Sequence, residues 1–590
     1  MHITITTIQN IKYCYVAECK WNPSEKKYDK PNKAVGKLDE EGHFVPNKYF
    51  SELLLRKTNN PDSISKFEQL IINTIKAKYG EDVKPGSFPK RNDIQTTNAF
   101  KTAAVIHYGP QLVFESITSR YRIDSMLNSA FGKDLARDIL SLSWYITSEG
   151  SALSNNDSWL DYFENPRGSG LSSQEVSKLL DMVDYDGIMT FYKLWLKGNN
   201  STDKVLYDLT SISYYGSGIH AADWGYNRDH ERLPQVNYAL LCVRNTAMPL
   251  FAWPLNGSIS DVSTLESTLQ FLNKFGYKPN CLMLDRGFAS KDNIVYMLQH
   301  RYTFLQALKV NAKWIYDIID AGDLVRCRPD SMLPIADRNY YVSITHLQLV
   351  FCRKYSGKKV KEESFFYQCK GKGDKYKPQD NEEVLDQYPC QAHVLFCQDL
   401  VGNSWDRFMW SLNSEYARLL SDPTAKVKSE YAPYFVITKP KYARKRIVDF
   451  NMEAITNHKN KYVGYICFLT NDPTIKTAED ALNEYSTRDY IEKDFDEMKN
   501  DLDMNRIRVH TDARMQARLF IQFIAEIFLR EIRFRLRNSD ACSKMTKAQI
   551  FSHIKTISKI RFQRKYKDVM PQLSKKQREI LEALEIKKIN

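Results

Sequence analysis

The strongest constraint on the fold lies between residues 203 and 308, where strand-like and helical segments follow one another in a definite order. Three runs typical of strands come first: DKVLYDLTSIS, NYALLCVRN and MPLFAWPL. A helical segment at 261–275, the short apolar run PNCLMLDRG, the helical segment KDNIVYMLQH and the run YTFLQAL follow. Short apolar runs indicate buried strands, and strands alternating with helices indicate crossover connections. The predicted order is therefore β-β-β-α-β-α-β.

Three meandering strands followed by α/β crossovers is the strand order of the ribonuclease H-like fold. Asp208 lies within the first strand and Asp285 at the end of the fourth. These strands are neighbours in such a sheet, so the two acids converge at one end of it, where α/β sheets bind ligands. Two close carboxylates repel one another unless a cation lies between them, which favours a Mg²⁺ site. Taken singly, each Asp is also consistent with a turn or capping residue.

A third acidic position lies on the helical segment ALNEYSTRDYIEKDFDEMKNDL. Four of its residues share one face: Tyr485, Arg488, Glu492 and Lys499. At about 100° per residue they fall within an arc of roughly 60°. This face offers a carboxylate that can complete a metal site and two cations that can hold phosphates. A solvated face of i,i+4 ion pairs is the alternative interpretation.

The spacing Tyr-x2-Arg-x3-Glu-x6-Lys resembles the signature around the catalytic glutamate of bacterial insertion-sequence DDE transposases. YDLTSISYY resembles the family's first-acid strand, LMLDRGFAS its second-acid block, and RIRVHTDARMQARLFIQFIAEIFL the helix after the signature. Glu492 follows Asp285 by 207 residues, which resembles a subgroup with a β-rich insertion between the second and third acids. The loop GYNRDHERLPQVNYALL matches the family's loop before the second strand only loosely.

The resemblance implies cut-and-paste transposition, with Asp208, Asp285 and Glu492 as catalytic acids. It implies that these carboxylates bind two Mg²⁺ ions, for which Mn²⁺ substitutes, and that in-line displacement at phosphorus cuts the element end and joins it to target DNA.

The resemblance also implies that Tyr485, Arg488 and Lys499 bind DNA phosphates beside the cut. The implied partners are double-stranded DNA, as terminal inverted repeats and as target, and a second copy of the chain once assembled on DNA. The implied setting is the bacterial cytoplasm.

The predicted fold class is α/β, a ribonuclease H-like core interrupted by a β-rich insertion, with helical N-terminal and C-terminal regions. The expected parts are an N-terminal region of strands then helices that binds DNA ends (1–200), the first part of the core (201–310), the β-rich insertion (311–478), the second part of the core with the third acid (479–540), and a basic helical tail (541–590). Within the first part, LSSQEVSKLLDMV and DGIMTFYKLWLKG are consistent with a helix-turn-helix module or with an ordinary helical hairpin.

Composition supports a nucleic-acid partner. The formal net charge of +13 indicates a polyanion, either nucleic acid or an anionic membrane surface. Between Arg530 and Asp568, Lys and Arg outnumber Asp and Glu by 12 to three. The sequence contains no run of about 18 apolar residues, so no membrane span is predicted. The 11 cysteines include no C-x-x-C pair, which argues against a zinc ribbon and fits a reducing compartment.

Three other functions are weighed against catalysis. A membrane-surface or RNA-binding protein that uses the basic tail would leave the acids unexplained. A catalytically inactive, transposase-derived DNA-binding protein would be expected to have lost an acid, and all three are present. Another ribonuclease H-like nuclease would be expected to be shorter and to lack the Tyr-Arg-Glu-Lys helix.

Overall fold

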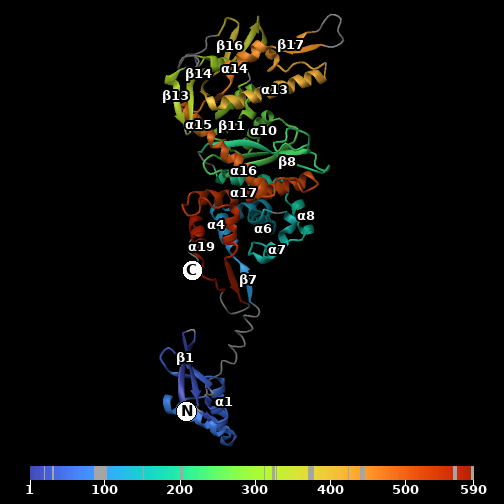
Figure 1. Cartoon of the computed structure of the whole chain (residues 1–590). Helices are drawn as coiled ribbons and strands as arrows, with labels where there is room; N and C mark the ends of the chain where they lie inside the picture. Colours follow the sequence, from blue (N-terminus) through green and yellow to red (C-terminus); the bar gives the residue numbers. More distant parts are fainter. Residues whose placement is uncertain are drawn as a thin grey trace. The chain divides into compact units, whose positions relative to one another are not determined.

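The protein consists of two compact units, seen in a computed structural model (Figure 1). Unit 1 comprises Met1–Val105 and Ile560–Met570, and unit 2 comprises Ile106–Lys559 and Pro571–Asn590. The structure describes residues 1–8, 10–18, 20–29, 32–84, 103–150, 152–199, 203–310, 313–321, 326, 328–335, 337–369, 378–422, 424–438, 446–562 and 568–586.

Unit 1 is an antiparallel sheet of order β1-β2-β5-β6 packed against two helices. Its core combines Cys14 and Val35 from the sheet with Phe50 from α1 and Ile72 from α2, all fully buried. The elements are β1 (His2–Ile8), β2 (Ile11–Ala17), β3 (Lys20–Asn22), β4 (Lys27–Asp29), β5 (Asn32–Leu38), β6 (Phe44–Pro46), α1 (Lys48–Asn59) and α2 (Lys66–Tyr79), with β7 (Ala104–His107) after them.

Unit 2 is built on a sheet of ten strands. The first five have the order β10-β9-β8-β11-β12, in which β9 runs antiparallel to its neighbours and β11 runs parallel to β8 and β12. The order of elements predicted for 203–308 is confirmed. These elements are β8 (Val205–Ser213), β9 (Gln235–Val243), β10 (Pro249–Asn256), α10 (Asp261–Lys274), β11 (Cys281–Leu284), α11 (Lys291–Gln299) and β12 (Thr303–Leu308).

Most described strands of the expected insertion continue this same sheet, and only β17 and β18 pair apart from it in a two-stranded sheet, so the prediction of a separate β-rich insertion at 311–478 is corrected. Strand β19 pairs antiparallel with β12, and β16, β14 and β13 follow outward. The physical reason is that the edge of β12 presents unpaired N–H and C=O groups, which a further strand satisfies. The elements are α12 (Lys313–Ala321), β13 (Met332–Ile335), β14 (Arg338–Ser356), β15 (Lys359–Cys369), β16 (Glu382–Phe396), α13 (Val401–Ser421), β17 (Phe435–Thr438), β18 (Ile447–Phe450), α14 (Met452–Tyr462) and β19 (Tyr465–Thr470).

Helix α17 (Asp512–Arg537) lies between the sheet and the helices that precede β8 (Figure 1). Its long apolar stretch FIQFIAEIFL is buried on every side, as expected for a helix that is hydrophobic all round. It contacts β10 on the sheet side and α4, α6 and α8 on the other, and it also contacts α9. These helices are α4 (Gly109–Tyr121), α5 (Ile123–Phe131), α6 (Lys133–Glu149), α7 (Asn156–Tyr162), α8 (Ser173–Met182) and α9 (Tyr185–Gly198).

The pair α8–α9 is a helical hairpin in which α8 contacts α17 and α9 contacts strand β10 of the sheet. Helix α8 begins with a capping box between Ser172 and Glu175. On α9, Tyr192 and Trp195 donate hydrogen bonds to backbone oxygens of β10, at 2.8 and 2.9 Å. The inner face of α9 is thus committed to the sheet.

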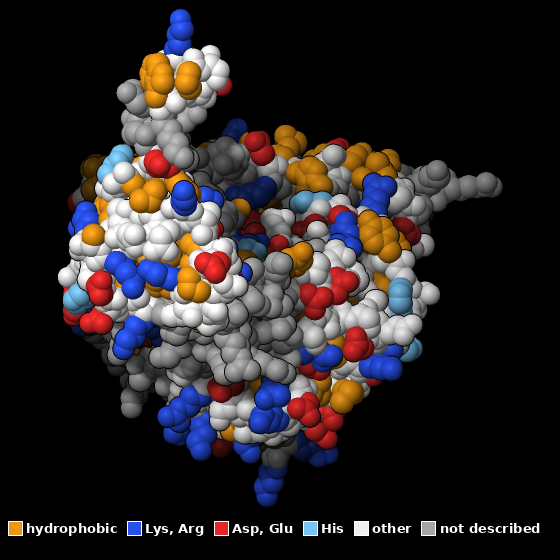
Figure 2. All heavy atoms as spheres, turned by 90° about the horizontal axis from the view of Figure 1, so that it is seen from below, with side chains coloured by type: hydrophobic (Ala, Val, Ile, Leu, Met, Phe, Trp, Pro, Cys, Tyr) orange, Lys and Arg blue, Asp and Glu red, His pale blue; other side chains and the backbone are white. Residues whose placement is uncertain are grey.

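The described C-terminal residues fold back onto unit 2. Helices α18 (Lys547–Ile554) and α19 (Lys575–Ala583) contact each other, and they pack on α4 and α17 respectively. Phe551 and Ile580 are buried in these contacts. Strand β20 (Ser558–Arg561) lies between the two helices in the sequence. Figure 2 shows Lys and Arg side chains interspersed with acidic and apolar ones over the visible face. The described helices of the predicted basic tail, α18 and α19, are therefore packed as well as charged.

Candidate active site

Two of the predicted acids stand side by side on the central sheet. Strands β8 and β11 are parallel neighbours, and Leu284 is level with Tyr207. The residues that follow these two, Asp285 and Asp208, therefore lie at the same level along the two chains. Asp208 is buried within β8, whereas Asp285 follows the last residue of β11. The sheet register alone thus brings the two carboxylates together.

The third acid is carried by a helix that packs on the same part of the sheet. Helix α16 (Arg488–Asp501) contacts β8 and buries Ile491, Phe495 and Met498 along one stripe. Helix α15 (Ala478–Ser486) precedes it, and Thr487 separates the two. The single helix predicted for this segment is therefore two consecutive helices, with Tyr485 on the first and Glu492 on the second.

One guanidinium group contacts all three acids. Arg488 Nη2 lies 3.1 Å from Asp208 Oδ2 and 3.3 Å from Asp285 Oδ2. Arg488 Nη1 lies 2.8 Å from Glu492 Oε1. Because both aspartate contacts share one nitrogen, the two aspartate oxygens are no more than 6.4 Å apart. The structure thus brings Asp208, Asp285 and Glu492 into a single cluster centred on Arg488.

The second oxygen of each aspartate is held by the chain itself. The backbone N–H of Leu209 donates to Asp208 Oδ1 at 2.8 Å. The phenol of Tyr485 donates to Asp285 Oδ1 at 2.7 Å. Each aspartate is therefore oriented by one fixed oxygen, and its other oxygen faces Arg488.

These contacts shift the pKa values of the two aspartates in opposite directions. Burial raises the pKa of Asp208 to about 6, although the charge of Arg488 counteracts it. Burial also acts to raise the pKa of Asp285, but Arg488 and the hydrogen bond from Tyr485 outweigh it, so this pKa is lowered. Burial acts to lower the pKa of Arg488, and the surrounding acids raise it overall. The cluster therefore favours a charged arginine beside an ionised Asp285.

Ion pairs hold α16 at several points along its length. Glu497 lies 2.9 Å from Arg530 of α17. Lys547 of α18 donates to the backbone oxygen of Asp501 at 2.6 Å. Lys499, the last residue of the predicted four-residue face, is paired with Asp229 of the β8–β9 loop at 2.5 Å. The structure thus places Lys499 against this loop, away from the three acids that Arg488 contacts.

The β8–β9 loop (214–234) presents aromatic side chains that the sequence analysis did not single out. Trp224 is 65% exposed and Tyr226 is 73% exposed. Two contacts fix the loop backbone. Gln235 Nε2 donates to the backbone oxygen of Tyr226 at 2.8 Å, and the backbone oxygen of Gly257 occupies the place where a side chain at Gly225 would begin. Large aromatic groups held outward on a fixed backbone are typical of an interaction surface.

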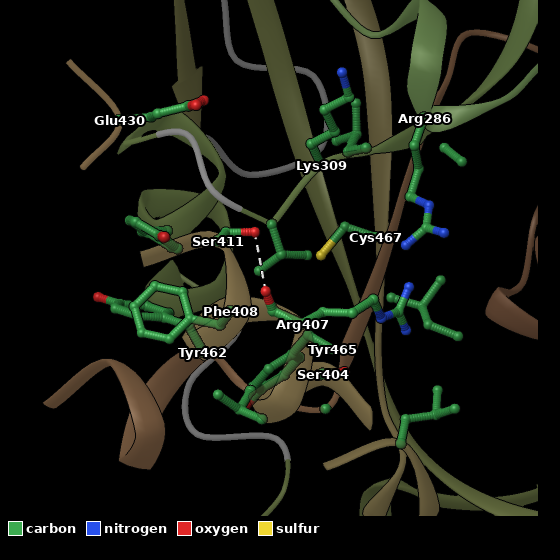
Figure 3. Close-up of a pocket in the computed structure, with 18 of the residues that line it drawn as sticks. Arg286, Lys309, Ser404, Arg407, Phe408, Ser411, Glu430, Tyr462, Tyr465 and Cys467 are labelled. Atoms are coloured by element: carbon green, nitrogen blue, oxygen red, sulfur yellow. Dashed lines mark hydrogen bonds between the residues drawn. The ribbon is translucent and has the colours of Figure 1, made fainter. Parts of the chain in front are cut away.

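A cavity of about 860 Å³ opens beside the acid cluster. One end is lined by Tyr226, Asp285, Arg286, Tyr485 and Arg488. The far end is lined by rings of α12, α13, α14 and the residues near β17, namely Tyr316, Phe408, Tyr434, His458 and Tyr462. Figure 3 shows the side chain of Arg407 extending across this cavity toward Arg286. The positions of these cations and rings were missed because they come from segments far apart in the sequence.

The carboxylates fit a hard divalent cation by their chemistry. Carboxylate oxygens are the preferred ligands of Mg²⁺ and Mn²⁺. In the described part of the chain, no three His, Cys, Asp or Glu side chains are arranged as a ready metal site. Arg488 lies among the three acids, so a metal requires that this side chain move.

The structure thus places two acidic residues on adjacent strands of a sheet with the ribonuclease H-like strand order, and a third on the helix that covers them. The family described as "Transposase DDE domain" matches residues 199–527, more than half of the chain. The chain belongs to this family and is a DDE transposase, an enzyme that acts on DNA. Enzymes of this family generally depend on divalent metal ions.

Other comparisons are sparser. No curated protein matches the sequence. Among solved structures, a piggyBac transposase synaptic complex with hairpin DNA is similar, with a TM-score of 0.33 and 10% identity, covering 77% of this chain and 82% of that chain. The strand order, rather than this similarity, defines the fold. In the described part of the chain, no helix is long and apolar enough to cross a bilayer.

Proposed function

We propose that Asp208, Asp285 and Glu492 are the catalytic and metal-binding residues of this transposase. The observation that carries the proposal is that all three carboxylates contact the guanidinium of Arg488. Two of these acids come from adjacent strands and one from the helix that covers them. They would hold two Mg²⁺ ions, with Mn²⁺ as a substitute, which supply Lewis-acid stabilisation and an activated oxygen nucleophile.

The side chains around the acids prepare the site. The backbone N–H of Leu209 and the phenol of Tyr485 each fix one carboxylate oxygen, so the ligands are oriented before the DNA arrives. Burial of Asp208 removes this carboxylate from water, which strengthens its electrostatic interactions. Tyr485 is engaged by a carboxylate, so a role as a covalent nucleophile is not part of the proposal.

DNA phosphates would be bound by Tyr485, Arg488 and Lys499, with Arg286 and Arg407 adding positive charge along the cavity. The substrates would be the terminal inverted repeats of a bacterial insertion sequence and its target DNA, in cut-and-paste transposition by two copies of the chain in the cytoplasm. Unit 1 and the helices before β8 would contribute to binding the element ends.

The test is a cleavage reaction beside a gel shift, on labelled DNA from the two flanks of the gene, with Mg²⁺. We expect Asp208→Asn, Asp285→Asn and Glu492→Gln each to abolish cleavage, because each removes a metal ligand worth several kcal/mol of transition-state stabilisation.

Binding to the element ends should stay nearly intact, because affinity comes from many Lys and Arg contacts. The matched control is Asp496→Asn, which removes an exposed acid from the same helix and should cleave normally. Full cleavage by the Glu492→Gln protein would contradict the assignment. If the unmodified protein binds the ends and never cleaves them, the chain is an inactive, DNA-binding derivative instead.

A further inference from the structure

We infer that Arg488 is an internal counter-ion that occupies the metal position in the DNA-free protein, so that metal and DNA phosphate each bind by releasing it from the acids. The inference rests on the proposed metal-binding role of the three acids and adds how that site is controlled.

The first step concerns which carboxylate oxygens are available. Asp208 Oδ1 and Asp285 Oδ1 already accept hydrogen bonds from Leu209 and Tyr485. The Oδ2 atoms of both aspartates are the ones that Arg488 contacts. Because both Oδ2 atoms contact one nitrogen of Arg488, a cation that these two oxygens share takes the place that the guanidinium holds.

The second step is that the two cations cannot share these oxygens. A Mg²⁺ ion binds oxygen at about 2.0–2.1 Å and demands near-octahedral geometry. The Arg488 nitrogens lie 2.8 to 3.3 Å from the same acids, so both cations would lie within a few ångströms of each other in a partly buried site. Charges this close and this poorly hydrated repel strongly. One cation must therefore leave before the other is fully bound.

The third step is that ion pairs hold Arg488 in place, while its hydrogen bonds are incomplete. Its Nε is buried and has no hydrogen-bond acceptor among the described residues. A buried donor without a partner costs free energy, so the arrangement is not the best that a guanidinium can reach. A DNA phosphate offers two oxygens in the fork geometry that guanidinium groups prefer.

The fourth step is that there is room for the arginine to move. Arg488 and Tyr485 line the cavity of about 860 Å³, together with Arg286. A phosphate entering this cavity would be attractive to both arginines and would draw Arg488 from the acids. The acids, then without a counter-ion, gain affinity for metal. By linkage, bound metal raises the affinity for phosphate by the same factor.

The test measures Mn²⁺ binding to the full chain without DNA, from the electron paramagnetic resonance signal of free Mn²⁺. Arg488→Gln should bind Mn²⁺ at least about tenfold more tightly than the unmodified protein, within the range of typical coupling between sites. The matched control is Lys493→Gln, which removes an exposed cation one residue after Glu492 and should leave Mn²⁺ affinity unchanged.

A short non-specific DNA duplex is then added, with Mn²⁺ binding to the duplex alone subtracted. It should raise the Mn²⁺ affinity of the unmodified protein and leave that of Arg488→Gln nearly unchanged. If Arg488→Gln does not fold, Arg488→Lys replaces it. A single ammonium group cannot contact all three acids at once, so its Mn²⁺ affinity should lie above that of the unmodified protein.

The two proposals fail in different ways. If Arg488→Gln, or Arg488→Lys in its place, binds Mn²⁺ no better than the unmodified protein while Asp285→Asn abolishes binding, the counter-ion role is wrong and the metal site stands. If Asp285→Asn and Asp208→Asn leave Mn²⁺ binding unchanged, the acids are not the metal ligands, and the proposed function itself is wrong.

Discussion

Replacement of Tyr485 by Phe separates two roles that this residue can have. In the structure its hydroxyl donates to Asp285 Oδ1 at 2.7 Å, and its ring lies 4.9 Å from that of Phe468. Tyr485→Phe keeps the ring and removes the hydrogen bond alone. A hydrogen bond to a charged group contributes about 1.5–3 kcal/mol. The Asp285 side chain is 22% exposed, so the lower end of that range applies. We expect cleavage to slow roughly tenfold, the equivalent of about 1.4 kcal/mol.

The assay is single-turnover cleavage of labelled element ends, with a gel shift on the same DNA. The hydrogen bond to Asp285 acts on the rate of cleavage, whereas the proposed phosphate contact of the same hydroxyl acts on DNA affinity. We expect the larger effect of Tyr485→Phe to lie in the rate of cleavage. A loss confined to DNA affinity, with the cleavage rate of bound DNA unchanged, would refute the view that Tyr485 orients Asp285 and would favour a direct phosphate contact.

Three further predictions follow from contacts around the site. Lys499→Ala should weaken binding to element ends and lower the slope of log K against log salt by about 0.9, as measured in filter-binding assays at several salt concentrations. An unchanged slope would mean that Lys499 only stabilises the β8–β9 loop. The double variant Trp224→Ala, Tyr226→Ala should bind DNA roughly tenfold or more weakly, because base stacking contributes about 1–3 kcal/mol per base. The slope of log K against log salt should stay unchanged. Unchanged affinity would mean that these rings do not contact DNA. A hydrogen bond from Arg418 lowers the pKa of Glu415 to about 2, so this pair stabilises the fold above the usual glutamate pKa and loses its effect as the pH falls toward 2. Glu415→Gln should therefore lower the melting temperature at pH 7, measured by tryptophan fluorescence, and the difference from the unmodified protein should shrink in acid.

The core of the fold could be predicted from the sequence because its strands are short, apolar and close together along the chain. The order of β8 to β12 follows from periodicity and turn residues within about one hundred residues. The position of β19 could not be predicted in this way. Its pairing with β12 joins Leu305 to Thr470, and strand periodicity carries no information on which distant edge a strand will meet. For the same reason, β13 to β16 were expected to form a separate unit.

The acids of the site could be predicted because each sits in a short recognisable block, and the register of β8 and β11 brings two of them together. The contacts of Arg488 could not be predicted. Its spacing from Glu492 suits an i,i+4 ion pair, but its contacts to Asp208 and Asp285 depend on how α16 packs on the sheet. Likewise, the cavity combines residues from β12, α12, α13 and α14, and only the folded chain assembles them.

The pairing of β12 with β19 has a consequence for how the protein is made. A ribosome that has just completed β12 must continue to Thr470 before the partner strand exists. At about 5–20 residues per second, this takes on the order of ten seconds. During that interval the outer edge of β12 is a bare template that another nascent chain can join. The central sheet can therefore close only after translation has passed Thr470, and until then strand exchange between neighbouring nascent chains competes with correct closure.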